Sequence, residues 1–312
     1  KINDADMRDL YAYFRNGVTA VENRRPRSTI RWPLNMRWPL KLWNLLFLKS
    51  EPYTPKSDKS PTWNRGAYLT QGLAHCGTCH TPRGFAMQEK ALDERGSGYL
   101  AGSTLSGWTA FNITSDPTSG IGAWKPEQLV QYLRTGSVPG VAQAAGPMGE
   151  AVQHSFSKMT MQDVQAIAEY LRTVPAVSNN LERARQDWGK PATDVTMLRG
   201  KPIETTIDAA RLYLGNCASC HQADGRGTPD GYYPPLLHNS TVGTRDTTNL
   251  VQVILFGIER KAGDKHIGMP AFARQLSDEQ LAALTNYVTR QFGDPATPEV
   301  TAEAIAKRRS AK

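Results

Sequence analysis

The sequence predicts an all-α protein in which tandem helical domains are joined by irregular linkers. Two observations lead to this prediction. The pattern Cys-x-x-Cys-His occurs twice in the 312-residue chain, at residues 76–80 and 217–221, and the two copies use all four cysteines. A similar succession of amphipathic helices and turns containing proline or glycine follows each copy. A repeated motif followed by a repeated helical pattern indicates two copies of one small domain.

Cys-x-x-Cys-His is the attachment signature of c-type haem. One helical turn brings the two thiols to the same side, where each adds to one vinyl group of the same porphyrin. The adjacent histidine then supplies the proximal nitrogen to the iron. The sequence therefore predicts two covalently bound c-type haems. The predicted attachment and proximal residues are Cys76, Cys79, His80, Cys217, Cys220 and His221.

Two other functions use paired cysteines. A zinc site needs four ligands, so the two distant pairs would have to meet or recruit further residues. A redox dithiol of the thioredoxin type follows a strand in an α/β pattern, and no such pattern is evident here. Neither function explains why a histidine directly follows the second cysteine in both copies, so haem attachment is favoured.

A middle helix is predicted after each motif. The first spans residues 127–135, with Pro126 suited to its first turn, and the second spans residues 248–256. Both carry apolar residues at positions i, i+1 and i+4. Both end at a glycine, Gly136 or Gly257, which is a signal for the C-terminus of a helix.

A methionine in a Pro-flanked loop follows each middle helix, in the runs Gly-Pro-Met and Gly-Met-Pro. A thioether at this place is the expected sixth iron ligand, and it raises the reduction potential relative to a second histidine. Met269 is the predicted ligand of the second haem. Met148 is predicted for the first haem, with Met159 and Met161 as alternatives. With both iron positions filled, neither haem has an open site for a substrate.

A closing helix completes each unit, at residues 160–171 and 277–288, with Thr160 and Ser277 as expected N-caps. The order of haem motif, middle helix, methionine loop and closing helix is that of a class I cytochrome c domain. The sequence thus predicts tandem class I cytochrome c domains.

The N-terminus carries a third helix of the closing type. Residues 3–14 align without gaps to the two closing helices, and Tyr13 matches Tyr170 and Tyr287. No Cys-x-x-Cys-His precedes this helix, and a single amphipathic helix cannot bury its apolar face alone. We therefore expect it to be the end of a first haem domain, most of which the chain lacks.

These patterns divide the chain into six segments. The predicted segments are the closing helix of the missing domain (1–18), an Arg/Trp/Pro-rich linker (19–60), a cytochrome c domain (61–178), a second linker (179–202), a second cytochrome c domain (203–295) and a basic tail (296–312).

Two further residues are candidates for binding haem propionates. Carboxylates shielded from water need hydrogen-bond or charge partners, and two haems bring four of them. Arg83 and Trp124 are the predicted partners, with ordinary packing or a solvated charge as the alternative for each.

The formal net charge is +8 at pH 7. A cluster of basic residues stands in the first linker: Arg24, Arg25, Arg27, Arg31, Arg37 and Lys41. Together with the haem motifs, this cluster favours an acidic protein partner or peripheral contact with an anionic membrane surface over nucleic acid. The sequence shows no signal peptide and no apolar run of the roughly 18–20 residues that span a bilayer. Because c-type haem is attached outside the bacterial cytoplasm, we expect a processed or truncated chain.

The chain resembles the three-haem cytochrome c subunit of membrane-bound bacterial dehydrogenases, which include quinoprotein alcohol dehydrogenase and the flavin-dependent gluconate, sorbitol and fructose dehydrogenases. The similar runs cover nearly the whole chain. They are Trp43 to Phe47, Arg65 to Leu69, His75 to Gly84, Asn112 to Asp116, Gly120 to Trp124, Gly146 to Met148, Asn216 to His221, Met269 to Phe272 and Gln275 to Gln280.

The resemblance implies an electron-transfer subunit rather than a catalytic one. A partner of quinoprotein, flavoprotein or molybdenum type would oxidise an alcohol, sugar or aldehyde in the periplasm. Electrons would then pass to membrane ubiquinone or another respiratory acceptor at the outer face of the inner membrane. A free soluble dihaem shuttle is the alternative. A dihaem peroxidase is disfavoured because it needs an iron with a vacant position.

Overall fold

The computed structural model describes residues 1–312 except 24–27, 34, 50, 194–205, 264 and 312. Arg24, Arg25 and Arg27 of the basic cluster therefore lie outside the described residues, as does the end of the second predicted linker (194–202). Among the helices in the described part, none has both the length and the apolar character needed to cross a bilayer.

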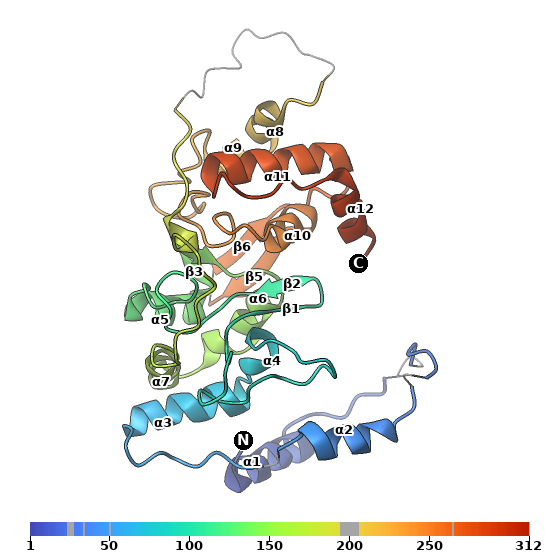
Figure 1. Ribbon diagram of the computed structural model, residues 1–312, viewed down its shortest axis with the longest axis vertical. Coiled ribbons are helices and arrows are strands. Elements are labelled where there is room, and N and C mark those ends of the chain that lie inside the picture. The colour runs from blue at the N-terminus through green and yellow to red at the C-terminus, as the bar shows by residue number, and fades with distance from the viewer. Residues whose placement is uncertain (24–27, 34, 50, 194–205, 264, 312) are drawn as a thin grey trace.

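Helices dominate the described chain, which forms two halves stacked along the long axis of the molecule (Figure 1). Those preceding residue 180 are α1 (Asp4–Asn16), α2 (Pro39–Phe47), α3 (Pro61–Tyr68), the π-helical turn η1 (Leu69–Leu73), α4 (Gly77–His80), α5 (Pro126–Thr135), α6 (Gly146–His154), η2 (Phe156–Lys158) and α7 (Met161–Leu171). Those that follow are η3 (Arg185–Asp187), α8 (Ala209–Asn216), α9 (Ala218–His221), α10 (Thr248–Phe256), α11 (Asp278–Phe292) and α12 (Ala302–Ser310).

The expectation of a purely helical protein is wrong in one respect, because the described residues also form three small antiparallel sheets of two strands each. The strands are β1 (Ser103–Leu105) with β2 (Trp108–Ala110), β3 (Ser137–Val138) with β4 (Ala142–Gln143), and β5 (Ile258–Ala262) with β6 (Lys265–Met269). Strands β5 and β6 pair Ile258 with Met269 and Arg260 with Ile267. Burial alternates along β5, since Arg260 is buried while Glu259 and Lys261 are exposed. This period of two is that of a β-strand.

The predicted helix ends are confirmed. Thr160 accepts a hydrogen bond from the Asp163 amide, and Ser277 and Gln280 form a reciprocal capping box. Helices α5 and α10 end at Gly136 and Gly257. In each half, the closing helix (α7 or α11) packs against the helix that precedes the haem motif (α3 or α8).

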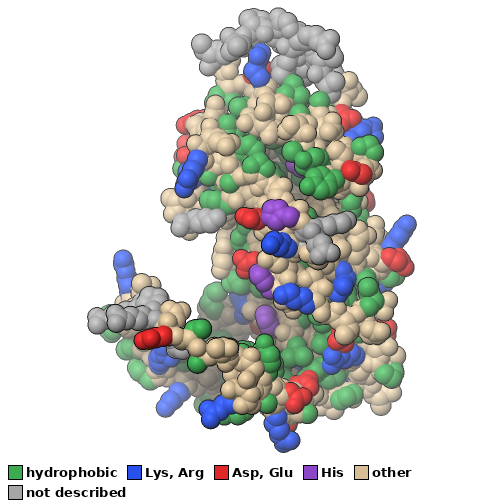
Figure 2. Space-filling view, turned by 180° about the vertical axis from the view of Figure 1, so that it is seen from behind, with side chains coloured by type: hydrophobic (Ala, Val, Ile, Leu, Met, Phe, Trp, Pro, Cys, Tyr) green, Lys and Arg blue, Asp and Glu red, His purple; other side chains and the backbone are tan. Residues whose placement is uncertain are grey.

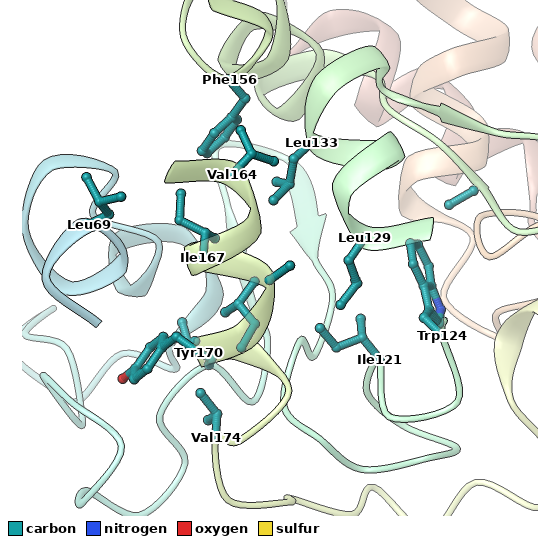
Figure 3. Packing of buried hydrophobic residues seen from close by; sticks show 14 of the residues in the cluster. Leu69, Ile121, Trp124, Leu129, Leu133, Phe156, Val164, Ile167, Tyr170 and Val174 are labelled. Carbon is teal, nitrogen blue, oxygen red and sulfur yellow. The ribbon is translucent and has the colours of Figure 1, made fainter. Parts of the chain in front are cut away.

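Each half has its own cluster of buried apolar residues. The first cluster is built from α3, α5, α7 and the intervening loops (Figure 3). Trp63 of α3 meets Tyr170 of α7 edge-on, with ring centroids 5.1 Å apart. Tyr213 of α8 and Tyr287 of α11 make the corresponding contact at 5.5 Å in the second cluster.

Hydrogen bonds join the two halves along β2, β5 and the loops beside them. The Thr109 amide donates to Asn249 Oδ1 (2.9 Å), and Asn249 Nδ2 donates back to the Thr109 carbonyl (2.8 Å). The Ser240 amide donates to the Val141 carbonyl (2.9 Å). The Lys261 amide donates to Gln153 Oε1 (2.7 Å). These bonds fix the register of one half on the other.

Helices α1 and α2 lie outside both apolar clusters, at one end of the molecule (Figures 1 and 2). Helix α1 buries none of its residues, so Met7 is exposed although it aligns with the buried Val164 and Leu281. The first turn of α1 is attached through Tyr68, whose hydroxyl donates to Asp6 and accepts from the Asn3 amide. Exposed apolar side chains gather on α1 and α2: Met7, Leu10, Tyr11, Tyr13, Phe14, Leu40, Leu42, Leu45 and Leu46.

The first predicted linker (19–60) contains helix α2, which packs on the loop that follows the first Cys-x-x-Cys-His. Trp43 Nε1 donates to the Ala86 carbonyl at 2.8 Å, and the rings of Phe47 and Phe85 meet edge-on at 6.2 Å. This segment is therefore partly a helix attached beside the first haem motif.

Part of the predicted basic tail (296–312) is folded and packed on the second half. It forms helix α12, in which Ile305 is fully buried in the second cluster. Arg308 donates to Thr248 Oγ1 at 2.9 Å, and Arg309 pairs with Asp278 at 2.8 Å. The basic residues of this segment thus secure it to α10 and α11.

Candidate haem-binding site

One large cavity of about 1400 Å³ lies between the two halves and is lined by residues of both. Sites for a single small molecule have volumes of about 300–1,000 Å³, so this cavity is large enough for more than one prosthetic group. Its walls include both haem motifs and both predicted methionine ligands. These residues are Cys76, Cys79, His80, Met148, Cys217, Cys220, His221 and Met269.

The two proximal histidines share one hydrogen-bond arrangement. His80 Nδ1 lies 2.7 Å from the Phe111 carbonyl oxygen, and His221 Nδ1 lies 2.8 Å from the Pro234 carbonyl oxygen. Since a carbonyl can only accept, Nδ1 must carry the proton and donate it. The lone pair of each ring is then on Nε2, the atom left free to bind a metal.

Burial also favours the ligand form of both imidazoles. It lowers the pKa of His80 and of His221, because a protonated ring would lose its hydration. A neutral imidazole is the form that coordinates iron. The local backbone thus sets the tautomer, and burial sets the charge.

The cysteines are free of disulfides and lie at the cavity wall. Burial raises the pKa of the Cys76 and Cys217 thiols to about 12. A redox dithiol reacts as the thiolate, which burial of these two thiols disfavours. The environment of these side chains suits neutral thiols and thioethers.

The two candidate methionines approach the cavity from unexpected elements. Met148 lies in the first turn of α6, and Met269 is the last residue of β6, so neither stands in the irregular loop that was predicted. Both line the cavity and pack against the apolar clusters. Of the two alternatives, Met161 is exposed on α7 and Met159 packs against the first cluster, and neither lines the cavity.

The glycines that end the middle helices allow the methionine segments to pass close by. Gly257 has φ +72°, and a Cβ there would overlap the Met269 carbonyl oxygen. Gly136 has φ +68°, and a Cβ there would lie 2.7 Å from Arg260 Nη1. These positions require glycine for both conformation and space.

The structure separates the two propionate candidates. Trp124 is 7% exposed and lines the cavity, and its Nε1 is buried without a hydrogen-bond partner among the residues described. Arg83 does not line the cavity. It donates to the carbonyls of Thr78 and Met87 and lies 3.8 Å from Glu89.

Sequence reasoning missed two buried arginines that line the same cavity. Arg185 is 6% exposed and comes from the predicted linker, and Arg260 is 2% exposed and comes from β5. Within the described part of the chain, neither pairs with a carboxylate. Burial lowers the pKa of Arg185 to about 10 and also lowers that of Arg260. The only sequence signal for Arg260 is its place in a strand-like alternation, and Arg185 has none.

Arg260 connects the second half to the methionine segment of the first half. Its Nε donates to the Ala144 carbonyl (3.1 Å), and its Nη groups donate to the carbonyls of Gly136 (2.9 Å) and Thr135. These carbonyls flank β3 and β4, and β4 leads directly into α6 and Met148. Arg260, which belongs to the second half, therefore fixes the backbone segment that leads to Met148 in the first half.

We expect Arg260→Met to lower the free energy of unfolding of the haem-containing chain by about 3 kcal/mol, because it leaves buried carbonyls without donors. Chemical denaturation followed by circular dichroism measures this loss. Lys261→Met is the matched control, since Lys261 is exposed on the same strand, and it should change stability by less than about 0.5 kcal/mol. Equal effects of the two substitutions would contradict the role assigned to Arg260.

Comparison with known proteins agrees with this geometry. The model of the cytochrome c family matches residues 207–291, which contain the second haem motif and Met269. The fructose dehydrogenase cytochrome subunit of Gluconobacter japonicus is 39% identical over 99% of this chain and 65% of its own length. The cytochrome c subunit of the quinone alcohol dehydrogenase of Gluconacetobacter polyoxogenes is 36% identical over 99% of this chain and 66% of its own length.

This chain covers a larger share of a third relative. The gluconate 2-dehydrogenase cytochrome c subunit of Pantoea cypripedii is 36% identical over 99% of this chain and 70% of its own length. The chain thus spans about two thirds of the length of these relatives. The cytochrome c match implies covalently bound haem c, and the residues around the cavity fit such a group. The chain belongs to the family of cytochrome c subunits of fructose, alcohol and gluconate dehydrogenases.

Proposed function

We propose that this chain carries two covalently bound haems and transfers electrons from the catalytic subunit of a dehydrogenase to ubiquinone or another respiratory acceptor. The observation that carries the proposal is the repeated ligand geometry around one cavity. In each half, a carbonyl directs Nε2 of the motif histidine for metal binding, and a methionine lines the same cavity.

Each haem would be held by residues of one half. In the first, Cys76 and Cys79 form the thioethers, and His80 and Met148 are the axial ligands. In the second, these roles fall to Cys217, Cys220, His221 and Met269. The proposed domains are 61–178 and 203–295, two class I cytochrome c domains, with 1–18 as the closing helix of a preceding domain and 19–60, 179–202 and 296–312 as connecting or terminal segments.

Bound haem supplies one-electron redox chemistry, and the protein sets the conditions for it. The apolar clusters keep water away from the ligand atoms, and a thioether ligand favours the reduced iron relative to a second histidine. The bonds between Thr109, Asn249, Ser240 and Val141 hold the halves in one arrangement. A fixed arrangement keeps the two attachment sites at a constant separation.

We place the chain in the periplasm, at the outer face of the inner membrane, with a dehydrogenase as its partner. Two observations support the partner and the attachment to another surface. The relatives are named as cytochrome subunits of dehydrogenases that oxidise a sugar, an alcohol or a sugar acid. The exposed apolar side chains of α1 and α2 form a surface of the kind that mediates association with proteins or membranes. A free dihaem shuttle has no need of such a surface.

Intact mass with a pyridine haemochrome assay tests the haem content, and we expect two haems per chain. One haem or none would contradict the proposal. Purification from native membranes tests the partner: we expect the chain to co-elute with a dehydrogenase subunit and its haem absorbance to show reduction when the substrate of that dehydrogenase is added. Elution of the chain as a lone monomer from the soluble fraction would favour the shuttle instead.

A further inference from the structure

The strongest unexplained feature of the described chain is a buried cation that pairs with no carboxylate among the described residues. The Arg185 guanidinium is enclosed at the wall of the cavity, and its Nη1 donates to the Ser119 carbonyl. Its Nε has no hydrogen-bond partner within the part of the chain that the structure describes. Burying an uncompensated charge is costly, so a site of this kind implies a negative group that the protein itself does not provide.

A second unpartnered donor lines the same cavity. Trp124 Nε1 is buried and makes no hydrogen bond to any described residue, and Figure 3 shows the Trp124 ring at the edge of the first cluster. Tyr132 neighbours Trp124, with the two rings meeting edge-on at 5.7 Å, and its phenol interacts electrostatically with Arg185. Burial raises the pKa of Tyr132 to about 12, so it stays neutral and does not balance the arginine.

Both donors belong to the first haem site rather than the second. The Arg185 guanidinium lies 4.6 Å from the centre of the Phe111 ring, and Phe111 provides the carbonyl that orients His80. Ser119, which accepts from Arg185, lies in the same loop as Trp124 and immediately precedes Gly120. Arg185 reaches this site from η3, beyond the predicted end of the first domain at residue 178.

We propose that Arg185, together with Trp124, binds a propionate group of the haem attached at Cys76 and Cys79. A propionate is a carboxylate carried by the group that the cavity is proposed to hold, and it can accept from a guanidinium and an indole N–H at once. The inference rests on the proposed function, because it requires a haem in the first site. The linker between the domains then supplies part of the first haem site.

The pairing has a consequence for the reduction potential of that haem. A buried positive charge near the porphyrin favours the reduced iron, which carries one positive charge fewer. Arg185 also stabilises the ionised propionate, so the propionate stays deprotonated across the neutral range. Without Arg185, burial would raise the propionate pKa, and the potential would fall with rising pH through that pKa.

Spectroelectrochemical titration of Arg185→Gln between pH 5 and 8 tests the proposal. The haem count is taken first, because absence of covalent haem in the unsubstituted chain would refute the proposed function itself. We expect the first haem of the variant to have a lower potential that depends on pH, while the second haem is unchanged. Arg185→Lys, which keeps the charge, should restore much of the potential.

Arg183→Gln is the matched control, since Arg183 lies in the same linker, is exposed and stacks on Trp188 at 4.7 Å. It should leave both potentials unchanged. Trp124→Phe, which keeps the ring contact with Tyr132 and removes the N–H, should lower the first potential by less than Arg185→Gln. Unchanged potentials in Arg185→Gln and Trp124→Phe with both haems retained, or a shift confined to the second haem, would overturn the proposal.

Discussion

The double variant Cys217→Ala/Cys220→Ala is expected to carry one covalently bound haem in place of two. In the proposed function, thioether bonds are the only covalent link between haem and chain, and each motif attaches one haem. The first motif lies in the other half with its own apolar cluster, so the haem at Cys76 and Cys79 should remain. Denaturing mass spectrometry, which retains covalent haem alone, measures the loss directly.

Ser219→Ala is the control for this variant because it changes the same short helix, α9, and keeps both thiols, removing only the weak hydrogen bond from the Ser219 hydroxyl to Cys220 Sγ (3.9 Å). It should keep both haems. Retention of two haems by the double variant would show that the cysteines do not attach haem. Loss of both would show that the halves do not bind haem independently, and it would refute the assignment of one motif to each half.

The double variant should also be less stable in its C-terminal half. Cys217 packs against the second cluster, and Met269, Leu284 and Val288 line the cavity beside it. Those apolar walls would face water if the haem were absent, which removes burial that favours folding. Increased hydrogen exchange in α10 and α11, with exchange in α5 and α7 unchanged, is the expected pattern.

The parts of the structure that could be predicted from the sequence are those set by local patterns. Capping residues, terminal glycines and apolar periodicity depend on neighbours within a few positions, so α5, α7, α10 and α11 lie where they were expected. The haem motifs themselves carry their chemistry in five adjacent residues. Local information was sufficient for each of these features.

The features that could not be predicted depend on contacts between distant residues. Strand β5 contains Arg260, whose burial makes sense only against the carbonyls of Thr135, Gly136 and Ala144 in the other half. In the sequence, Arg185 looks like a surface charge in a linker. Its burial results from the chain folding back over Phe111, which is distant in sequence. Met7 follows a core periodicity, yet α1 has no covering element among the described residues.

Met269→Ala should remove the contribution of the second haem to the far-red absorption band that reports thioether coordination of iron, leaving that of the first haem, and it should lower the potential of the second haem. Met269 ends β6 at the cavity wall, where its register with Ile258 holds it beside α10. Axial ligands set haem potentials over a range of about 0.8 V. The change should therefore exceed any shift produced by a surface charge.

Met161→Ala is the control, because it removes a methionine that is not proposed to bind iron. Met161 is exposed on α7 and lies outside the cavity, so this variant should keep both the band and the two potentials. Met148→Ala should affect the first haem as Met269→Ala affects the second, because the two methionines hold equivalent places after the middle helices. An undiminished band in Met269→Ala would mean that another side chain binds the second iron. It would also contradict the assignment of His221 and Met269 as the axial ligands of that haem.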